Sequence, residues 1–189
     1  MGSKGTEKRQ RIVDAANRLF YHKGFTATSF ADIAQDCGVP KGNFYFYFRT
    51  KENLLDAVIH ERMERITAHL DTIYHDFPNP RERLHRIANI PFYDHHEVVQ
   101  YGCPMGTLSA ELGKLAPTGQ NAMMAMYSLM LQTTHRCLED MGHERDNAER
   151  QARHMLTCLQ GAANLAHTFK DERWLETEIE AVHAWIDTL

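Results

Sequence analysis

The chain has 189 residues, of which 43% are hydrophobic and 24% charged, with a formal net charge of −4; this composition excludes extensive disorder. No run approaches the roughly 18 apolar residues of a membrane span, and no apolar stretch near the start indicates a secretory signal, so we expect a cytoplasmic protein. Residues 1–52 hold nine Lys or Arg against five Asp or Glu, whereas residues 53–189 hold twelve against twenty. This asymmetry predicts that only the N-terminal part meets a polyanion.

Helical periodicity runs through the whole chain, and no stretch shows the sustained alternation of a β-strand. We therefore predict an all-α protein. A first helix is expected at residues 6–22, ending before Gly24, because glycine readily adopts the left-handed conformation that closes a helix. A second helix, capped by the hydroxyl of Thr28 or Ser29, is expected to end at Gly38.

A third, brief helix is predicted at residues 40–46, because Pro40 suits the first helical position, where a backbone N–H would be unpaired anyway. A long fourth helix is predicted to begin near Thr50 and to end before Pro78. At about 1.5 Å per residue it would reach about 40 Å, enough to leave an N-terminal bundle and enter a second domain. This helix is the expected connector.

The rest of the chain is predicted to form one larger helical bundle. Its helices are expected at residues 81–90, 120–141, 147–169 and 172–189. The segment 101–113 is expected to begin with the turn-like Gly102-Cys103-Pro104, after which Leu108 and Leu112 resume helical spacing. Residues 93–100 show no clear periodicity and are treated as a loop. The expected domains are a helix-turn-helix domain at residues 1–52 and a helical effector-binding and dimerisation domain at residues 53–189.

Residues 29–48 have the pattern of two helices joined by a tight turn that contains glycine. Val39 is expected to close the turn, and Phe44 and Phe48 to complete a small core. The side chains left outside would form a polar, aromatic and basic face made of Lys41, Gly42, Asn43, Tyr45 and Tyr47. Such a face on a helix-turn-helix indicates DNA binding.

Three segments carry a family resemblance: Ile-Val-Asp-Ala-Ala-Asn-Arg-Leu-Phe at 12–20, Lys-Gly-Phe at 23–25, and Val-Pro-Lys-Gly-Asn-Phe-Tyr-Phe-Tyr-Phe-Arg-Thr-Lys-Glu-Asn-Leu at 39–54. In this order they resemble the N-terminal signature of the tetracycline-repressor (TetR/AcrR) family of transcriptional regulators. The resemblance implies a three-helix DNA-binding head, a helical body, and a homodimer that reads successive major grooves. It also implies a ligand- or stress-responsive repressor of a pseudo-palindromic operator, released by a small-molecule effector.

The resemblance further implies contacts with double-stranded DNA. Thr28 and Ser29, at the start of the second helix, are expected to touch phosphates. Lys41 can donate to guanine, and Gly42 permits close approach to a base. The set is completed by Asn43 in the first turn of the third helix, Tyr45 against a thymine methyl or a phosphate, Tyr47 on a phosphate, and Lys51 as a nonspecific charge. Phe46 stands where the family commonly has a more polar aromatic residue, and it is left out.

Residues 102–112, Gly-Cys-Pro-Met-Gly-Thr-Leu-Ser-Ala-Glu-Leu, resemble an element that lies near the effector cavity in one branch of the family. Some members of that branch sense electrophiles or oxidants through a cysteine there, so Cys103 is a candidate sensor thiol; an inert buried cysteine is the alternative. Methionines and aromatics nearby could line an adaptable pocket, although their helical spacing also fits a core. The predicted effector-binding residues are Phe92, Tyr93, Tyr101, Cys103, Met123, Met126, Tyr127 and Met130.

Two apolar stripes near the C-terminus are predicted to pair across a twofold axis as a four-helix bundle. The predicted dimer-interface residues are Ala152, Leu156, Leu159, Ala163, Ala166, Trp174, Leu175, Ile179, Val182 and Ile186. For the two tryptophans of the chain, packing within the core is an equal explanation.

Other chemistry finds little support in the sequence. The four cysteines form no CxxC pair, which argues against a disulfide framework or a zinc knuckle. Neither the run Asp94-His95-His96-Glu97 nor the pair His154 and Cys158 gives a complete ligand set, so we expect no metal and no cofactor. Because no paired nucleophile and base is recognisable, we expect no enzyme; a thiol-dependent enzyme that uses Cys103 with a nearby histidine is the competing class.

Overall fold

The computed structural model describes residues 3–113 and 117–189. They form helices, turns and loops, and no strand occurs among them, which confirms the predicted all-α class. Contacts divide the chain into two compact units, Met1–Glu64 with Thr107–Gln120, and Arg65–Gly106 with Asn121–Leu189. The helices that run from one unit into the other are α4 (Lys51–Asp76), α7 (Pro104–Leu112) and α8 (Pro117–Asp140). The functional boundary after residue 52 stays a prediction.

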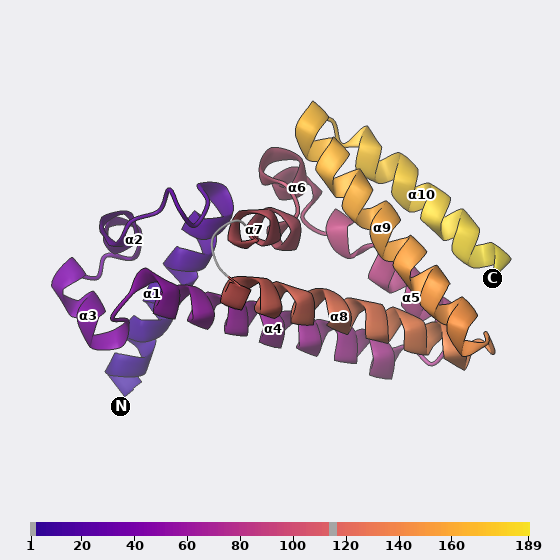
Figure 1. Cartoon of the computed structure of the whole chain (residues 1–189), viewed down its shortest axis with the longest axis horizontal. Coiled ribbons are helices and arrows are strands. Elements are labelled where there is room, and N and C mark those ends of the chain that lie inside the picture. Colours follow the sequence, from indigo (N-terminus) through magenta and orange to yellow (C-terminus); the bar gives the residue numbers. More distant parts are fainter. Residues whose placement is uncertain (1–2, 114–116) are drawn as a thin grey trace. The chain divides into compact units, whose positions relative to one another are not determined.

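The first unit is built on α1 (Ser3–His22), against which α2 (Phe30–Cys37) packs (Figure 1). Both expected glycine stops are confirmed: Gly24 has φ 88° and Gly38 has φ 64°, a left-handed region that residues with a Cβ rarely adopt. Buried apolar side chains from successive helices form the core of this unit, among them Ile12, Ala16, Phe20, Ile33, Phe44 and Leu54.

The third helix is less regular than predicted. In place of one helix over residues 40–46, a 3-10 turn η1 (Lys41–Asn43) leads into the single-turn helix α3 (Phe44–Tyr47). Pro40 has ψ 134° and precedes the turn as its N-cap instead of occupying the first helical position. Glycine and asparagine, both weak helix formers, occupy the turn, and the regular helix begins only after them.

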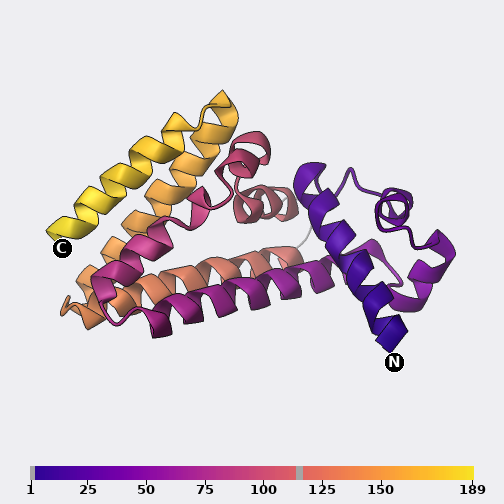
Figure 2. The same cartoon turned by 180° about the vertical axis from the view of Figure 1, so that it is seen from behind.

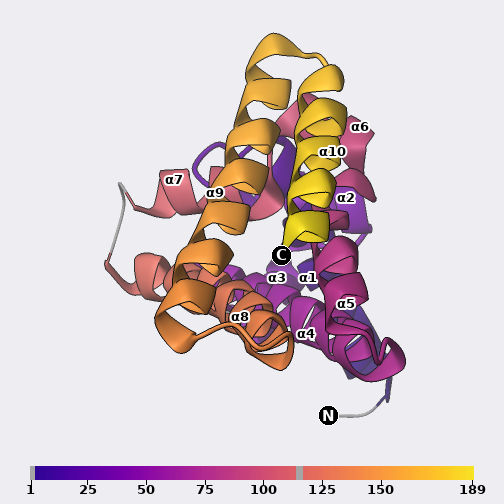
Figure 3. The ribbon, with the colours of Figure 1, turned by 90° about the vertical axis from the view of Figure 1, so that its right-hand side faces the viewer.

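The second unit surrounds one apolar core. Besides parts of α4 and α8, which run alongside each other (Figure 2), it contains α5 (Pro80–Ala88), η2 (Ile90–Phe92), α6 (His95–Tyr101), α9 (Arg145–Phe169) and α10 (Arg173–Thr188). Helices α9 and α10 lie side by side, and α5 packs on α10 (Figure 3). Five of these helices each contribute a buried leucine to the core: Leu70, Leu84, Leu138, Leu159 and Leu175.

Helix α6 corrects the prediction of a loop at residues 93–100. Val98 is the only buried residue of this seven-residue helix, and its apolar residues do not recur at helical spacing over several turns, so there is no periodicity to detect. The helix ends at Gly102, where φ is 86°, and α7 (Pro104–Leu112) starts within the turn-like stretch expected at residues 102–104. No helix in the described ranges is both long and apolar enough to cross a bilayer.

Candidate nucleic-acid interface and effector region

Ser29, one of the two residues predicted as the cap of α2, is the one that forms it. Its Oγ accepts a hydrogen bond from Asp32 N at 3.2 Å, and the Asp32 carboxylate accepts one from Ser29 N at 2.8 Å. These hydrogen bonds from Ser29 hold the pKa of the Asp32 carboxyl below its ordinary value. Because Ser29 is exposed, this reciprocal capping box presents the start of α2 to solvent.

Thr28 lies inside the first unit, contrary to its predicted role as a phosphate contact. It is 1% exposed, and its hydroxyl donates to the carbonyl oxygen of Gly24 at 2.7 Å. A phosphate cannot reach a side chain enclosed in this way, so the prediction of a direct contact by the Thr28 side chain is wrong. The residue instead folds the loop after α1 back onto the end of that helix.

The segment formed by η1 and α3 has a buried inner side and an exposed outer side. Phe44 and Phe48 are buried, as predicted, and the Phe44 ring lies 5.4 Å from the ring of Phe30. The predicted outward residues Lys41, Gly42, Asn43 and Tyr45 are exposed, and Tyr47 is partly exposed. The structure therefore gathers five of the eight predicted DNA contacts on one short segment.

Phe46 is a surface residue that the sequence analysis left out. It is 73% exposed, and its ring meets the ring of Tyr47 edge-on with centroids 5.1 Å apart. The ring is therefore open to contact from outside the chain. The signal was present in the sequence, because a helix of four residues cannot bury five consecutive aromatic rings.

Lys51 is engaged with the protein's own backbone. Its Nζ donates to the carbonyl oxygens of Phe25 at 2.9 Å, Thr26 at 3.3 Å and Thr28 at 3.0 Å, and it lies 4.4 Å from the centre of the Phe25 ring. All three ammonium hydrogens have partners in this arrangement. The prediction that Lys51 is a nonspecific phosphate contact is therefore not supported, since the charge holds the loop between α1 and α2.

Glu111 of α7 binds the same loop through the backbone N–H groups of that loop. Its carboxylate accepts hydrogen bonds from Phe25 N at 2.8 Å and from Thr26 N at 2.6 Å. A Cβ at Gly24 would lie 3.2 Å from Glu111 Oε2, so glycine also gives the carboxylate room. Lys51 and Glu111 thus hold the loop through its carbonyl and N–H groups respectively, an arrangement that we call the loop clamp.

Opposing effects act on the Glu111 carboxyl. Burial alone would raise its pKa, but hydrogen bonds from Thr26 and Phe25, together with the positive charge of Lys51, outweigh burial and place the pKa below its ordinary value. Glu111 is therefore a carboxylate at neutral pH. The sequence motif at residues 102–112 contains Glu111 but does not indicate this role, because the partners of Glu111 lie more than 80 positions earlier in the chain.

Cys103 lies immediately before α7 in a small polar cluster of the second unit. Gln160 Nε2 donates to Cys103 Sγ at 3.6 Å, and the Tyr127 hydroxyl donates to Gln160 Oε1 at 3.2 Å. Burial raises the pKa of Tyr127 to about 12, and the electrostatic effect of Cys103 adds to it in the same direction. This phenol therefore keeps its proton. All four cysteines are free thiols, and Cys103 is partly exposed.

The other predicted effector residues lie in different surroundings. Met123, Met126 and Met130 are buried, as the alternative core interpretation requires. Tyr93 is exposed and contacts the ring of His69, while Phe92 stacks on His95. Tyr101 is partly exposed in the last turn of α6. Hydrogen bonds connect Cys103 and Tyr127 through Gln160.

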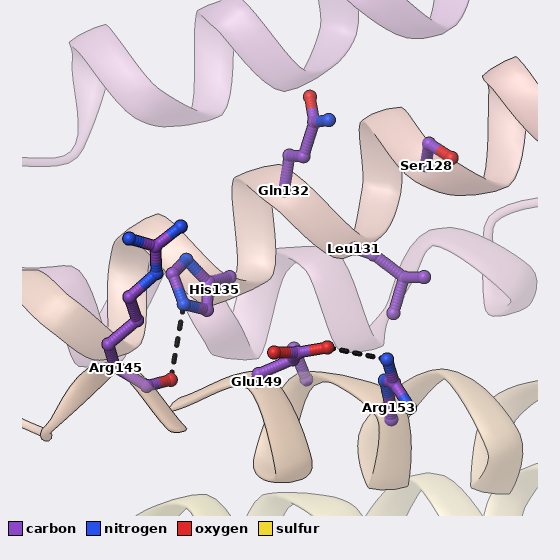
Figure 4. Close-up of a pocket in the computed structure, with 8 residues that line it drawn as sticks. Ser128, Leu131, Gln132, His135, Arg145, Glu149 and Arg153 are labelled. Carbon is purple, nitrogen blue, oxygen red and sulfur yellow. Dashed lines mark hydrogen bonds and ion pairs between the residues drawn. The ribbon is translucent and has the colours of Figure 1, made fainter. Parts of the chain in front are cut away.

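A surface hollow of about 320 Å³ lies between α8 and α9 (Figure 4). It is lined by Ser128, Leu131, Gln132, His135, Arg145, Glu149, Ala152 and Arg153. Arg153 and Glu149 form an ion pair on its α9 side, and His135 of α8 lies 3.3 Å from the Arg145 carbonyl oxygen. Of the eight predicted effector residues, none lines this hollow.

Most of the predicted dimer-interface residues lie inside the second unit. Ala152, Leu159, Ala163, Ala166, Leu175, Ile179, Val182 and Ile186 are buried in the core that α9 and α10 share with α4, α5 and α8. Side chains enclosed within one chain are little available to a partner, so the structure does not support these eight as interface residues. Leu156 is partly buried, and Trp174 is 42% exposed, its ring stacked on exposed Phe169.

Comparisons with known sequences agree with this architecture. The family described as "Bacterial regulatory proteins, tetR family" matches residues 12–58, and the one described as "Transcriptional regulator LmrA/YxaF-like, C-terminal domain" matches residues 93–181. A relative from Lactococcus lactis subsp. lactis, an uncharacterized HTH-type transcriptional regulator in the lacX 3' region, is 31% identical over 122 residues. That match covers 64% of this chain and 62% of the relative, which is less than two thirds of its length.

Solved structures share the fold over nearly the whole chain. A TetR transcriptional regulator from Chloroflexus aurantiacus J-10-FL superposes with a TM-score of 0.85 at 21% identity, over 97% of this chain and 96% of that one. The reduced form of E. coli NemR gives a TM-score of 0.78 at 23% identity, over 93% and 95% of the two chains. At these identities the likeness concerns the fold alone.

Proposed function

Because this chain belongs to the TetR family of bacterial transcriptional regulators, we propose that it is a repressor that reads operator DNA through η1 and α3. The observation that carries the proposal is the two-sided recognition segment: Phe44 anchors it in the core, while its outer residues stand in solvent. A short segment presented in this way suits the major groove. A cytoplasmic location follows from the proposal, since operator DNA lies there.

Lys41 and Gly42 are the proposed base readers. Lys41 is exposed and can donate to guanine. A Cβ at position 42 would meet no protein atom within 4 Å, so the fold does not require glycine there, whereas close approach to a base does. Ser29, Asn43, Tyr45 and Tyr47 are proposed to contact phosphates or base edges, and we add Phe46 as an apolar contact. Thr28 and Lys51 act through the fold of the loop.

A homodimer is proposed to place two heads on one operator. The buried stripe is replaced as the interface by the exposed faces of α9 and α10, where Leu165, Phe169 and Trp174 are exposed apolar side chains. A Cβ at Gly161 would meet nothing within 4 Å inside the chain, which leaves space for close approach of a second helix. Half-sites about 34–36 Å apart, or a multiple of this, would let both heads read one face of the duplex.

Release by an effector is proposed to act through α7. This helix begins in the second unit, after Cys103, and continues into the first, where Glu111 holds the loop that leads into α2. An effector that binds one position of α7 better than another would change the population of clamped loops. The effector site itself is proposed at the cluster of Cys103, Tyr127 and Gln160.

Operator selection from a random DNA library, followed by titration of variants, tests the DNA proposal. Lys41→Ala is expected to weaken binding to the selected operator by about 1–3 kcal/mol, with a smaller effect on random DNA, because a base contact is lost. Arg150→Ala is the matched control: it removes one positive charge from an exposed position on α9 and is expected to leave operator affinity unchanged.

Two results would contradict the assignment of Lys41. An equal loss of operator affinity in Lys41→Ala and Arg150→Ala would show that only net charge matters. A loss of affinity in Lys41→Ala that is the same on operator and random DNA would make Lys41 a phosphate contact. Binding that does not weaken between about 50 and 200 mM salt would contradict DNA binding altogether, since phosphate contacts release counterions.

Thiol sensing is the second candidate function, and the partly exposed Cys103 at the start of α7 favours it. N-ethylmaleimide is the probe: the thiolate adds to the ring alkene, a carbon–sulfur bond forms, and the neighbouring carbon takes a proton. The thioether would displace Gln160 from the cluster. Modified wild-type protein is expected to lose operator binding, and Cys103→Ser to keep it.

Cys158→Ser is the control for this experiment. Cys158 is also partly exposed, but burial and a hydrogen bond to Glu178 raise its pKa, so it should react more slowly. If N-ethylmaleimide still releases Cys103→Ser from operator DNA, the sensor role of Cys103 is excluded. Catalytic conversion of an electrophile, with many product molecules per protein, would instead indicate the thiol-dependent enzyme.

A further inference from the structure

We propose that His95, His96 and Glu172 bind a divalent first-row transition ion, for which Zn²⁺ is the probe. The histidines begin α6, and the glutamate lies in the turn between α9 and α10, near α6 in Figure 1. One ligand atom from each residue lies within 4.8 Å of the other two. The proposal goes beyond DNA binding and does not depend on it.

The distances suit a small ion. His95 Nε2 is 3.5 Å from Glu172 Oε2, and His96 Nδ1 is 3.9 Å from the same oxygen. Zinc binds imidazole nitrogen and carboxylate oxygen at about 2.0–2.2 Å, which places two ligands of a tetrahedral ion about 3.3–3.6 Å apart. The separation between His95 and Glu172 already fits this range. A small rotation of the His96 side chain, which is 85% exposed, would bring its nitrogen into the same range.

The His95 ring is oriented as a ligand would be. Its Nδ1 lies 3.1 Å from the carbonyl oxygen of Phe92, and a carbonyl can only accept, so Nδ1 carries the hydrogen. In the neutral ring Nε2 then directs a lone pair toward the Glu172 carboxylate. Two electron-pair donors that face each other need a cation between them, and a backbone carbonyl on the far nitrogen is the usual support of a metal-bound histidine.

Neighbouring polar contacts fix the turn that carries Glu172. Lys170 Nζ donates to the carbonyl oxygens of Val99 at 3.3 Å and Gln100 at 2.6 Å, and so holds the turn against α6. Asp171 accepts hydrogen bonds from Arg173 Nε at 3.0 and 2.9 Å. Lys170 is thus bound to α6, and Asp171 and Arg173 are bound to each other. Glu172 is the charged group of the turn that faces the histidines.

The donor set and its exposure indicate the class of ion. Two imidazoles and one carboxylate suit zinc and its first-row neighbours, whereas calcium and magnesium prefer oxygen ligands throughout. Because the site lies at the surface, the ion can enter from water, and water can complete its coordination. A bound ion would join α6 to the turn between α9 and α10.

Calorimetric titration of ZnCl₂ into the metal-free full chain tests the site. One tight equivalent and a higher melting temperature in zinc are expected, because the ion binds the folded arrangement. Glu172→Gln and His96→Asn are each expected to weaken this binding at least about tenfold. Both positions are partly or fully exposed, so the variants should fold, and the metal-free melting temperature checks that they do.

His60→Asn is the matched control, because His60 and Glu64 form an exposed histidine–carboxylate pair of the same 3.5 Å length, to which no third ligand is added among the described residues. It should keep wild-type zinc affinity. Equal affinity in wild type and Glu172→Gln would overturn the proposal, since zinc would then bind elsewhere, as at His154 and Cys158. A melting temperature that responds to pH but not to zinc would overturn it too, by showing that a proton is the cation.

Discussion

Phe44→Ala is expected to lower the free energy of unfolding by about 3–5 kcal/mol. Operator binding is expected to weaken as well. The side chain is 0% exposed and packs on Phe30, and it is the one buried residue of a four-residue helix. So short an element cannot close the cavity by shifting, because its remaining residues make few inward contacts. Urea denaturation followed by circular dichroism should show the loss as a lower midpoint.

Phe46→Ala is the control for this change, two positions further along the same helix. It should leave the unfolding free energy within about 0.5 kcal/mol, since an exposed ring loses little when truncated. Operator affinity should nevertheless fall if the ring contacts DNA as proposed. Equal destabilisation by the two alanines would show that the inner and outer sides of α3 are wrongly assigned.

Removal of the Glu111 charge is expected to open the loop clamp. In Glu111→Gln the oxygen can still accept from one of the two N–H groups, but the new amide would face the other donor, at a cost of about 1–3 kcal/mol. Lys51→Met removes the donor to the three carbonyl oxygens of the same loop. A double-mutant cycle should give a coupling of about 0.5–3 kcal/mol. Additive effects would exclude a shared clamp.

The same clamp predicts a dependence of stability on pH. Because the pKa of Glu111 is lowered in the folded protein, its contribution is complete above the unfolded value of about 4.3 and is lost as pH falls below that value toward the folded pKa. Wild type should therefore lose more stability than Glu111→Gln when pH is lowered from about 6 to 4. Parallel curves for the two proteins would contradict the prediction.

Lys41→Ala separates the clamp from the DNA-reading surface. Both Lys41 and Lys51 belong to the family signature, but Lys41 is exposed, whereas Lys51 is bound to the loop. We expect Lys51→Met to lower stability and Lys41→Ala to leave it unchanged while operator binding falls. Two variants that behave alike in denaturation would refute this division of roles.

Local sequence predicted those parts of the fold that local chemistry decides. Glycines at positions 24 and 38 adopt the left-handed conformation that stops a helix, and the Ser29 hydroxyl binds the next turn of its own helix. Both effects act over a few residues, so the pattern alone could reveal them. The assignment of Phe44 and Phe48 to the core followed in the same way from the spacing of the aromatic residues.

Roles that depend on distant partners were not predictable. Lys51 and Thr28 have the positions of DNA contacts in the signature, yet hydrogen bonds with residues 19–28 turn both inward. The apolar stripes on α9 and α10 showed that these faces are buried, but periodicity does not say against what, and the two helices bury each other within one chain. Glu172 likewise reaches the histidines only through the fold.

The anchoring of the segment formed by η1 and α3 through its buried inner side has a consequence for how binding specificity would diverge. Lys41, Gly42, Asn43, Tyr45 and Phe46 are all exposed and lie outside the core, whereas Phe44, the capping box and the loop clamp set the orientation of the segment. If these residues read bases as proposed, substitutions at the exposed positions are expected to alter which bases are read at little cost in stability. A duplicated copy of this gene could acquire a new operator by changes confined to residues that folding does not constrain.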